Sequence, residues 1–553
     1  DSDGDGIGDL NGITSRLDYI QSLGVDIIWL NPIFLSPNDD NGYDISDYRE
    51  IMREFGTMED FDRLLKEIHK REMRLVLDLV VNHTSDEHPW FEEARKSRHN
   101  PYYNYYHWWP AEKGEPPLRL SYFDEEGNAW TYNKPTDSYY LHYFSRKQPD
   151  LNWENPEVRQ EIFDMMRFWF DKGIDGFRMD SISLIAKDPS FPLIDSKKYP
   201  DIFSFYAKEP RLHLYLHEMN RQVLSKYDCM SVGEGSAVMV DDVAKFVDPA
   251  REELNMLYHF DAARIRNTTL PDNPESGIDY SLIALKKMFT EWDKAVDKGW
   301  PSIYLSNHDQ PRMVSRFGSD KDEFRALSTK MLITFLLTMR GTPYWFAGDE
   351  IGMRNIRFDR IEDYNDIDTI NRYKKAKAEG KDPQAVLDEQ KETGRDNART
   401  PFQWDRSPEA GFTAGTPWLK VNPDYTWINV ADEEKDPTSI LNYFKKVVSF
   451  RKENPSLIYG SYHLLDAENP QSYTFLRKTG ADTYLIMLNF SPKAAISTPG
   501  IDMSNAHVLL DNYGDRSHMA PQKDITLRPF EAIVFQLNHP VYESFIDSLD
   551  LLE

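Results

Sequence analysis

The sequence predicts an α/β fold: a parallel (β/α)8 (TIM) barrel with a subdomain inserted after its third strand, followed by a C-terminal antiparallel β domain. Three observations predict it. Short β-branched apolar runs alternate with longer amphipathic stretches over most of residues 1–459, an irregular aromatic-rich stretch interrupts them at 84–148, and closely spaced short strands replace them after residue 460. Strands that alternate with helices are typical of a parallel sheet with right-handed crossovers.

Seven runs are candidate barrel strands, at residues 25–30, 75–81, 176–180, 230–233, 254–260, 302–306 and 342–346. A closed barrel of this kind needs eight strands. Because neither a strand nor an initiator Met precedes Asp1, we expect the first strand and any targeting segment to lie before the printed numbering. The clearest helix is 156–172, where Asn155 can cap, Pro156 suits the first position and Gly173 follows the end.

Two stretches depart from the alternation. Residues 84–148 include the run PYYNYYHWWP and are too long for an ordinary connection, so we expect an inserted subdomain over the strand ends. A second excursion, at about 352–404, contains a predicted charged helix at 374–392. The barrel is therefore expected to comprise residues 1–83 and 149–459.

Residues 460–553 form the predicted C-terminal β domain. Its strands read as short alternating runs such as YTFLRK, TYLIMLNF and AIVFQL. Residues 538–553 resemble an extra helical tail.

Composition excludes several classes of partner. The chain has 65 basic and 92 acidic side chains, a net charge of −27, which argues against binding nucleic acid or an anionic membrane. No apolar run reaches the ~18 residues of a membrane span, and the single Cys229 excludes an intrachain disulfide framework. We expect a cytoplasmic protein, with a periplasmic location left open, and a monomer or weak homo-oligomer. Aromatic residues make up 13% of the chain, and their faces can stack on sugar rings as well as fill a core.

Polar residues at the carboxyl ends of the predicted strands mark the candidate site, because a parallel barrel builds its site there. They are Asn82, His83, Arg178, Asp180, Glu234, Asn307, His308 and Asp309. Arg178 and Asp180 are two residues apart on a strand and so point to one face. We expect the guanidinium to lower the pKa of Asp180 and keep it ionised as a nucleophile, and desolvation to raise the pKa of Glu234 and suit it to be a general acid.

Two carboxylates in different environments form the arrangement that glycoside hydrolysis uses. The alternatives are a structural ion pair between Arg178 and Asp180 and a helix-capping role for Glu234. His83 and His308 each follow an Asn at a strand end, which favours hydrogen bonding to substrate hydroxyls over a purely structural role. A zinc site is not predicted, because no HExxH or CxxC spacing occurs.

Several motifs resemble those of the α-amylase superfamily of glycoside hydrolases (family 13), in its oligo-1,6-glucosidase/α-glucosidase branch. They are DLVVNH (78–83), QPDLNWENPEVR (148–159), GFRMD (176–180), VGEG (232–235), SNHDQPR (306–312) and GRDNARTPFQW (394–404). They occur in family order over nearly the whole chain. The resemblance implies a (β/α)8 barrel, an inserted domain and a C-terminal β-sandwich.

Carried over to this sequence, the resemblance implies Asp180 as nucleophile, Glu234 as acid/base and Asp309 as the carboxylate that stabilises the transition state. Arg178, His83 and His308 would complete the subsite for the reacting sugar. In DNGYD, Asp40 and Tyr43 match a pair that closes the pocket. Tyr43 would stack under the ring, and Asp40 would pair with an arginine that we place at Arg399, with Arg395 as the other candidate. The implied enzyme removes single glucosyl units from non-reducing ends with retention.

The acidic start of the chain predicts a calcium site. Asp1, Asp3, Asp5, the Ile7 carbonyl and Asp9 fall at alternate positions, as in the first part of an EF-hand loop. Position twelve is Gly12, so the loop is not an EF-hand, but its hard oxygen ligands select Ca²⁺. The resemblance implies a structural calcium here; the alternative is a solvated acidic terminus.

The substrate stays open among short oligosaccharides and disaccharides: isomalto-oligosaccharides, maltose, sucrose or sucrose isomers. Ser181, after the predicted nucleophile, matches neither the Val of α-1,6-preferring relatives nor the Ala or Thr of α-1,4-preferring ones. Sucrose isomerases carry RLDRD where this chain has AARIRNTT (262–269), which favours hydrolysis. The alternatives are a sucrose isomerase or transglucosidase that forms trehalulose or isomaltulose, and a non-catalytic transporter-associated relative.

Overall fold

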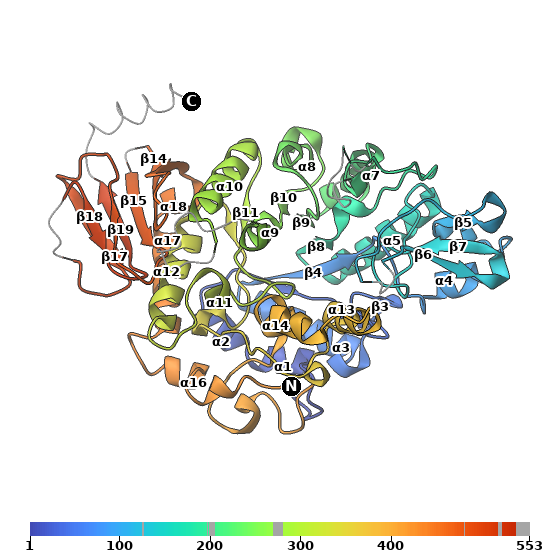
Figure 1. Cartoon of the computed structure of the whole chain (residues 1–553), viewed down its shortest axis with the longest axis horizontal. Coiled ribbons are helices and arrows are strands. Elements are labelled where there is room, and N and C mark those ends of the chain that lie inside the picture. Colours follow the sequence, from blue (N-terminus) through green and yellow to red (C-terminus); the bar gives the residue numbers. More distant parts are fainter. Residues whose placement is uncertain are drawn as a thin grey trace.

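A computed structural model describes residues 1–123, 127–195, 197, 205–268, 280–480, 482–517 and 522–537. An α/β body occupies the middle of the molecule, with the inserted sheet at one end and the C-terminal sheet at the other (Figure 1). The tail predicted at 538–553 lies outside the described residues. In the part of the chain that the structure covers, no helix has the length and apolar character to cross a membrane.

The seven predicted parallel strands are all present. Five form one sheet in the order β1 (Ile27–Leu30), β4 (Arg74–Val80), β8 (Gly176–Asp180), β9 (Met230–Glu234), β10 (Met256–Tyr258), and every neighbouring pair is parallel. The other two, β11 (Ser302–Ile303) and β12 (Thr342–Pro343), form a second parallel pair. Buried side chains such as Leu77 and Phe177 place these strands in the main hydrophobic core.

Helices connect the strands and pack on them; most are amphipathic, whereas α12 is buried on nearly all sides. The longer ones are α3 (Met58–Lys70), α5 (Pro156–Lys172), α7 (Arg211–Gln222), α10 (Leu282–Ala295), α12 (Arg325–Thr338) and α17 (Ile440–Glu453). The prediction for α5 is confirmed: Asn155 accepts a hydrogen bond from the Glu157 amide, and Gly173 ends the helix at φ 106°. Shorter helices are α1 (Leu10–Ser15), α2 (Leu17–Ser22), α8 (Ala244–Val247), α9 (Asp261–Thr268), α11 (Met313–Phe317), α16 (Val430–Glu433) and α18 (Ser456–Tyr459).

The aromatic-rich insertion has its own small antiparallel sheet. Its elements are α4 (Pro89–Ala94) and the strands β5 (Trp108–Pro110), β6 (Trp130–Asn133) and β7 (Ser138–Leu141), in the order β5-β7-β6. The ring of Phe91 packs edge-on against Tyr106 and Tyr140. Part of the aromatic excess of the chain therefore builds the interior of this segment. A short hairpin, β2 (Phe34–Leu35) with β3 (Asp47–Ile51), brings the DNGYD motif to the strand ends.

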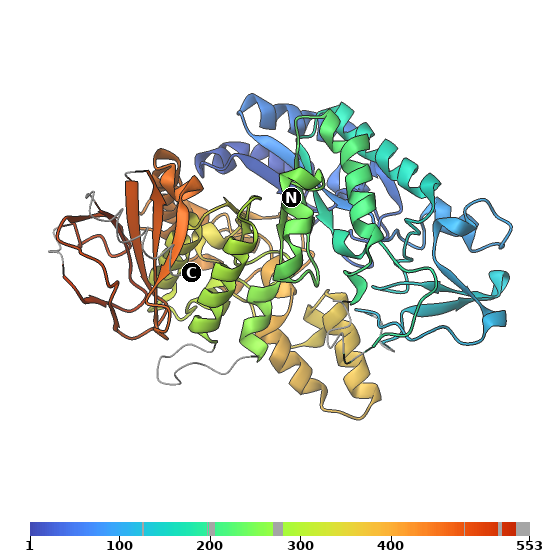
Figure 2. The ribbon, with the colours of Figure 1, turned by 90° about the horizontal axis from the view of Figure 1, so that it is seen from above.

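The second excursion differs from the single helix predicted at 374–392. It holds two helices, α13 (Ile367–Ala378) and α14 (Pro383–Thr393), followed by α15 (Asp396–Arg399). The single-helix prediction was wrong because Gly380, at φ 68°, breaks the helix and Pro383 starts the next one. The two helices project beside the inserted segment (Figure 2), where Asn371 donates a 2.6 Å hydrogen bond to the Phe123 carbonyl.

The predicted C-terminal antiparallel domain is confirmed for the described residues. Its main sheet runs in the order β13 (Ser461–Leu465), β14 (Ser472–Thr479), β15 (Asp482–Asn489), β19 (Ala532–Leu537), β17 (Ala506–Asp511), and β16 (Ala495–Ser497) pairs with β18 (Ile525–Leu527). Leu485 and Phe535 of the main sheet share a buried cluster with Leu527 of the small one.

Candidate active site

One buried arginine joins the strand-end carboxylates. Arg178, fully buried on β8, donates from Nη1 to Asp78 Oδ1 and to Asp180 Oδ1, both at 2.8 Å. Its Nη2 lies 2.5 Å from Glu234 Oε2, and its Nε donates to the Tyr258 hydroxyl at 2.7 Å. The register of β4, β8, β9 and β10 explains the cluster, because Asp78 is opposite Arg178 and Tyr258 is opposite Glu234.

The two central carboxyls have raised pKa values. Burial raises the pKa of Glu234 to about 8 despite the attraction of Arg178, as expected for a general acid. Burial also raises the pKa of Asp180, and here the sequence-based expectation of a lowered value was wrong. The physical reason is that desolvation exceeds the effect of a guanidinium that Asp180 shares with two other carboxylates.

The residue after the predicted nucleophile holds the predicted acid. Ser181 has a left-handed backbone, φ 43°, and its amide donates to Glu234 Oε2 at 3.1 Å. Ser236 donates from its hydroxyl to the other carboxylate oxygen, Oε1, at 2.9 Å. The strained conformation of Ser181 therefore aims a backbone donor at Glu234.

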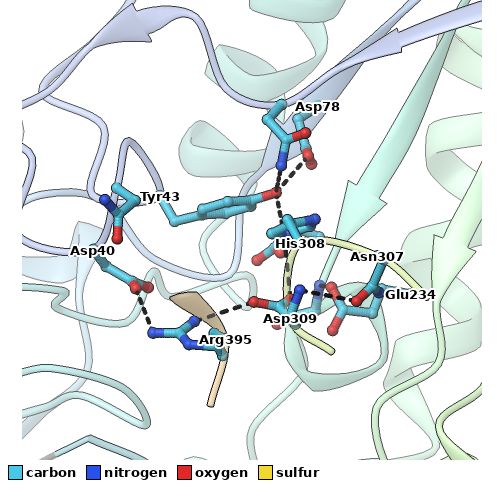
Figure 3. Close-up of polar contacts among 12 residues, drawn as sticks. Asp40, Tyr43, Asp78, Glu234, Asn307, His308, Asp309 and Arg395 are labelled. Atoms are coloured by element: carbon cyan, nitrogen blue, oxygen red, sulfur yellow. Dashed lines mark hydrogen bonds and ion pairs between the residues drawn. The ribbon is translucent and has the colours of Figure 1, made fainter. Parts of the chain in front are cut away.

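The third carboxylate, Asp309, lies among cationic and imidazole groups. Arg395 Nη1 and Arg399 Nη2 lie 3.1 and 3.0 Å from its Oδ1, and His308 Nε2 lies 3.2 Å from its Oδ2. Burial alone would raise the pKa of Asp309, but His308 and the two arginines outweigh it and hold the value well below the usual range. The Asp309 amide donates to Asn307 Oδ1 at 2.9 Å (Figure 3). Asp309 is thus a permanent anion at the site.

The arginine that pairs with Asp40 is Arg395, which corrects our placement of the pair at Arg399. Arg395 Nη2 lies 3.2 Å from Asp40 Oδ1, and Figure 3 shows Arg395 between Asp40 and Asp309. Arg399 instead donates to the His308 carbonyl at 2.8 Å and to Asn41 Oδ1 at 3.0 Å. The two arginines are four residues apart, one helical turn, so spacing along α15 could not separate them.

Tyr43 links the two sides of the site. Its ring is stacked on that of His308, with centroids 5.3 Å apart and planes 6° apart. Its hydroxyl donates to Asp78 Oδ2 at 2.9 Å, accepts from Asn31 Nδ2 at 3.1 Å, and lies 2.8 Å from His308 Nε2 (Figure 3). Tyr43 therefore connects Asp78 of the strand cluster to His308, the neighbour of the predicted third carboxylate.

His83 lies next to the backbone of Tyr43. Its Nε2 is 3.0 Å from the Tyr43 carbonyl and 3.2 Å from Gln148 Nε2. Burial lowers the pKa of His83 to about 3, so the ring is neutral. Gln148 also donates to Asp40 Oδ2 at 3.2 Å and so joins His83 to the closed end of the pocket.

A cavity of about 290 Å³ adjoins Tyr43, His308 and Arg399. It extends between these residues and Phe402 and Trp418. Asp180, Glu234 and Asp309 are not among its lining residues, so this cavity adjoins the edge of the site at Tyr43, His308 and Arg399 and has room for several water molecules.

The predicted calcium loop brings three of its carboxylates together. Oxygen atoms of Asp1, Asp3 and Asp9 all lie within 4.8 Å of one another, whereas Asp5 is not in this group. Asp5 Oδ1 accepts from the Ile7 amide at 2.7 Å. Asp9 also caps α1 by accepting from the Gly12 amide. Three clustered hard oxygen donors fit a divalent cation.

Comparison with known proteins identifies the family. The model of the α-amylase catalytic domain matches residues 1–460.

The chain belongs to the α-amylase family of glycoside hydrolases.

Relatives in the family are similar in sequence to this chain over almost its whole length. An oligo-1,6-glucosidase from Parageobacillus thermoglucosidasius is 51% identical over 98% of this chain and 96% of its own, and one from Bacillus cereus is 48% identical over 97% and 96%. The solved isomaltulose synthase SmuA from Protaminobacter rubrum is 42% identical, has a TM-score of 0.92, and is matched over 98% of this chain and 96% of its own. The predicted family and glycoside hydrolase class are confirmed.

Three residues of the site described above were not assigned from the sequence. Asp78 and Gln148 lie inside the quoted motifs, and Tyr258 lies within the predicted strand at 254–260 and ends the observed strand β10. The signal for Asp78 was a charged residue within an apolar strand, which is costly to bury without a partner. The sequence carried no comparable signal for Tyr258, because the predicted strand extended two residues beyond it.

Proposed function

We propose that this chain is a retaining, exo-acting α-glucosidase that hydrolyses terminal non-reducing α-glucosidic bonds of short oligosaccharides or disaccharides. The observation that carries the proposal is the bridge from Arg178 to both Asp180 and Glu234, two carboxyls with unequal environments, at strand ends. The oligo-1,6-glucosidase relatives support the same activity.

The reaction would proceed by double displacement. Asp180 attacks the anomeric carbon and forms a glucosyl ester while Glu234 protonates the departing glycosidic oxygen. Glu234, now ionised, then takes a proton from water, whose oxygen attacks the same carbon and releases Asp180. Arg178 and the Ser181 amide stabilise Glu234 when it is charged, and the permanent anion Asp309 faces the developing positive charge of the sugar. A retaining mechanism requires the two carboxyls to lie ~5–5.5 Å apart, which stays a prediction.

Exo action would follow from the closed end of the pocket. Asp40 is 5% exposed and paired with Arg395, and both sit beside Asp309. A sugar bound against Tyr43 would meet this pair, so there is no room there for a further unit beyond the non-reducing end. Only the terminal glucosyl group would reach Asp180.

We also propose the finer architecture on the same basis. The parallel strands would close into a (β/α)8 barrel formed by residues 1–83 and 149–459, with the insertion at 84–148 and a β-sandwich within 460–553. The family match and the strand order are consistent with it. Asp1, Asp3, Asp9 and the Ile7 carbonyl would hold a structural Ca²⁺, whose charge would offset the clustered carboxylates.

Sucrose isomerisation is the second candidate function. A trehalulose synthase, 41% identical with a TM-score of 0.92 over 97% of each chain, is among the similar solved structures. In such a reaction the glucosyl ester would pass to the fructose released from the same sucrose instead of to water. The absence of the RLDRD motif at 262–269 favours hydrolysis.

Product analysis by NMR tests the proposal. Wild-type protein given isomaltose, maltose or sucrose should release glucose, which on sucrose, where no second glucose is formed, should appear first as the α-anomer, and Asp180→Asn should release none. First-formed β-glucose would exclude retention, and trehalulose or isomaltulose from sucrose would establish isomerisation. No turnover of any substrate would favour the non-catalytic alternative.

A further inference from the structure

Asp366 is a buried carboxylate next to the site that the proposed reaction does not use. It is 0% exposed and lies at the N-cap of α13, in the second excursion. Its Oδ1 accepts from Arg395 Nε at 2.7 Å and lies 2.6 Å from Arg395 Nη2. Its Oδ2 faces the other way and accepts from the Thr369 amide at 2.9 Å and the Thr369 hydroxyl at 2.7 Å.

The contacts of Arg395 are unequal. Its distances to Asp366, 2.6 and 2.7 Å, are shorter than those to Asp40, 3.2 Å, and Asp309, 3.1 Å. A guanidinium has five N–H donors in a fixed plane. Asp366 takes the edge formed by Nε and Nη2, which directs Nη1 to Asp309 and leaves the other Nη2 hydrogen for Asp40.

Without this third carboxylate, Arg395 would have a choice. Asp40 and Asp309 lie at nearly equal distances from two different nitrogens, so the side chain could turn to pair fully with either one. The first arrangement would remove a cation from Asp309, and the second would open the pair that closes the pocket. Asp366 holds the plane between them.

The backbone around Asp366 is itself held. The amides of Asn365 and Asp366 donate to Asp396 Oδ2 at 2.7 and 2.9 Å, and Asp396 directly follows Arg395. The N-terminus of α13 adds two donors to the far side of the Asp366 carboxylate, which stabilises its negative charge. The carboxylate is therefore fixed on both sides, as a positioning group must be.

We propose that Asp366 is a positioning residue of the active site, which orients Arg395 so that this arginine contacts Asp309 and Asp40 at the same time. The proposal rests on the proposed α-glucosidase activity. Asp366 touches no substrate in this scheme and acts through Arg395, whose nitrogens lie 2.6 and 2.7 Å from its Oδ1; Arg399 Nη1 is farther away, at 3.8 Å. It also ties the α13–α14 excursion to the closed end of the pocket.

The test compares Asp366→Asn with a matched substitution. Asp366→Asn keeps an oxygen for the α13 cap but loses the charge that holds Arg395, so kcat/KM on p-nitrophenyl α-glucoside should fall at least tenfold. Asp382 caps the neighbouring α14 through the Gln384 amide in the same excursion, and Asp382→Asn should stay within twofold of wild type. If the wild-type protein does not hydrolyse p-nitrophenyl α-glucoside, the proposed function is refuted. If Asp366→Asn is as active as the wild type, only the positioning role is refuted.

A double-mutant cycle separates positioning from a general structural role. In an Arg395→Ala background, Asp366→Asn should lower kcat/KM by less than threefold, because its partner is already gone. If Asp366→Asn lowers kcat/KM by the same factor in the Arg395→Ala background as in the wild type, the two residues act independently and the proposal is overturned. If Asp366→Asn does not fold, Asp366→Glu takes its place. Glu keeps the charge but moves the carboxylate by one methylene, so kcat/KM should again fall, and wild-type activity would contradict the proposed role.

Discussion

Two arginine-centred clusters make up the site, and they are built in opposite ways. Arg178 lies on a central strand, and its carboxylate partners Asp78, Asp180 and Glu234 lie on the same strand or on its immediate neighbours. Arg395 lies just before a four-residue helix, and its partners come from connections more than 300 residues apart along the chain. The strand cluster depends on sheet register, whereas the loop cluster depends on how several connections pack together.

The clusters also differ in electrostatics. In the strand cluster three buried carboxyls share one guanidinium. The effect of burial exceeds the attraction of that cation, so the pKa values of Asp180 and Glu234 are raised. Asp309 has two arginines and His308 around it, and its pKa is lowered instead. Two arginines and His308 around one carboxyl keep Asp309 charged, whereas Glu234, which shares a single guanidinium, can hold the proton that the proposed reaction transfers.

Breaking the strand cluster at its nucleophile should abolish activity. Asp180→Asn keeps the side-chain shape but cannot form the glucosyl ester, so kcat should fall by at least ~10⁴-fold. Steady-state assays with p-nitrophenyl α-glucoside measure this, with Asp382→Asn as the folded control. Residual activity within a hundredfold of wild type would exclude Asp180 as the nucleophile.

The raised pKa of Glu234 should appear in the pH profile. The acid must be protonated, so kcat/KM should fall as the pH rises through about 8. It should also fall on the acid side as Asp180 becomes protonated, at a pH above the ordinary aspartate value, because burial raises the pKa of Asp180. Glu234→Gln should lower kcat on isomaltose by about 10³-fold and remove the alkaline limb. If the alkaline limb persists in Glu234→Gln, it reports the titration of a group other than Glu234, and the assignment is wrong.

Breaking the loop cluster should have a smaller effect of a different kind. Arg395→Ala removes a charged hydrogen-bond partner from Asp309 and opens the pair with Asp40, and kcat/KM should fall about 30-fold. The limbs of the pH profile should not move, because Arg395 touches neither Asp180 nor Glu234. A shifted alkaline limb would show that the two clusters are coupled.

Tyr258→Phe tests whether Arg178 controls the pKa of Glu234. The variant cannot accept the hydrogen bond from Arg178 Nε, so the guanidinium acts more strongly on Glu234 and lowers the pKa of that carboxyl. The alkaline limb should move to lower pH, with kcat reduced about fivefold, because the hydroxyl accepts from both Nε and Nη2 of Arg178 and both hydrogen bonds are lost. An upward shift of the limb would contradict the proposed hydrogen-bond balance.

Calcium removal should leave both clusters intact. If Ca²⁺ at 100 times its Kd binds only the folded chain, it adds about 2.7 kcal/mol to the free energy of unfolding. EDTA should therefore lower Tm by a few degrees and leave kcat unchanged, and Asp3→Asn should remove the effect of added Ca²⁺. An unaltered Tm in calorimetry would refute the site.

The contrast between the clusters explains what was predictable. Residues that end strands were found because an apolar run followed by a polar residue is visible in the sequence, and Arg178, Asp180 and Glu234 were all found in this way. Arg395 and Arg399 are one helical turn apart, and nothing in the chain order shows which one reaches Asp40. The pKa of Asp180 was predicted in the wrong direction, because a neighbouring arginine is visible in the sequence but two other carboxyls that share it are not.

The parallel strands, the inserted and C-terminal antiparallel segments, the family and the strand-end carboxylates could be predicted from the sequence, because periodicity and local motifs are properties of short segments. The folded structure was needed to show that Arg395 pairs with Asp40, that Tyr258 and Asp78 complete the Arg178 cluster, and that Asp366 lies against Arg395. These contacts join residues 29 to 355 positions apart in the chain, on neighbouring strands in one cluster and on packed connections in the other. Their charges act on one another only after folding has removed the water between them.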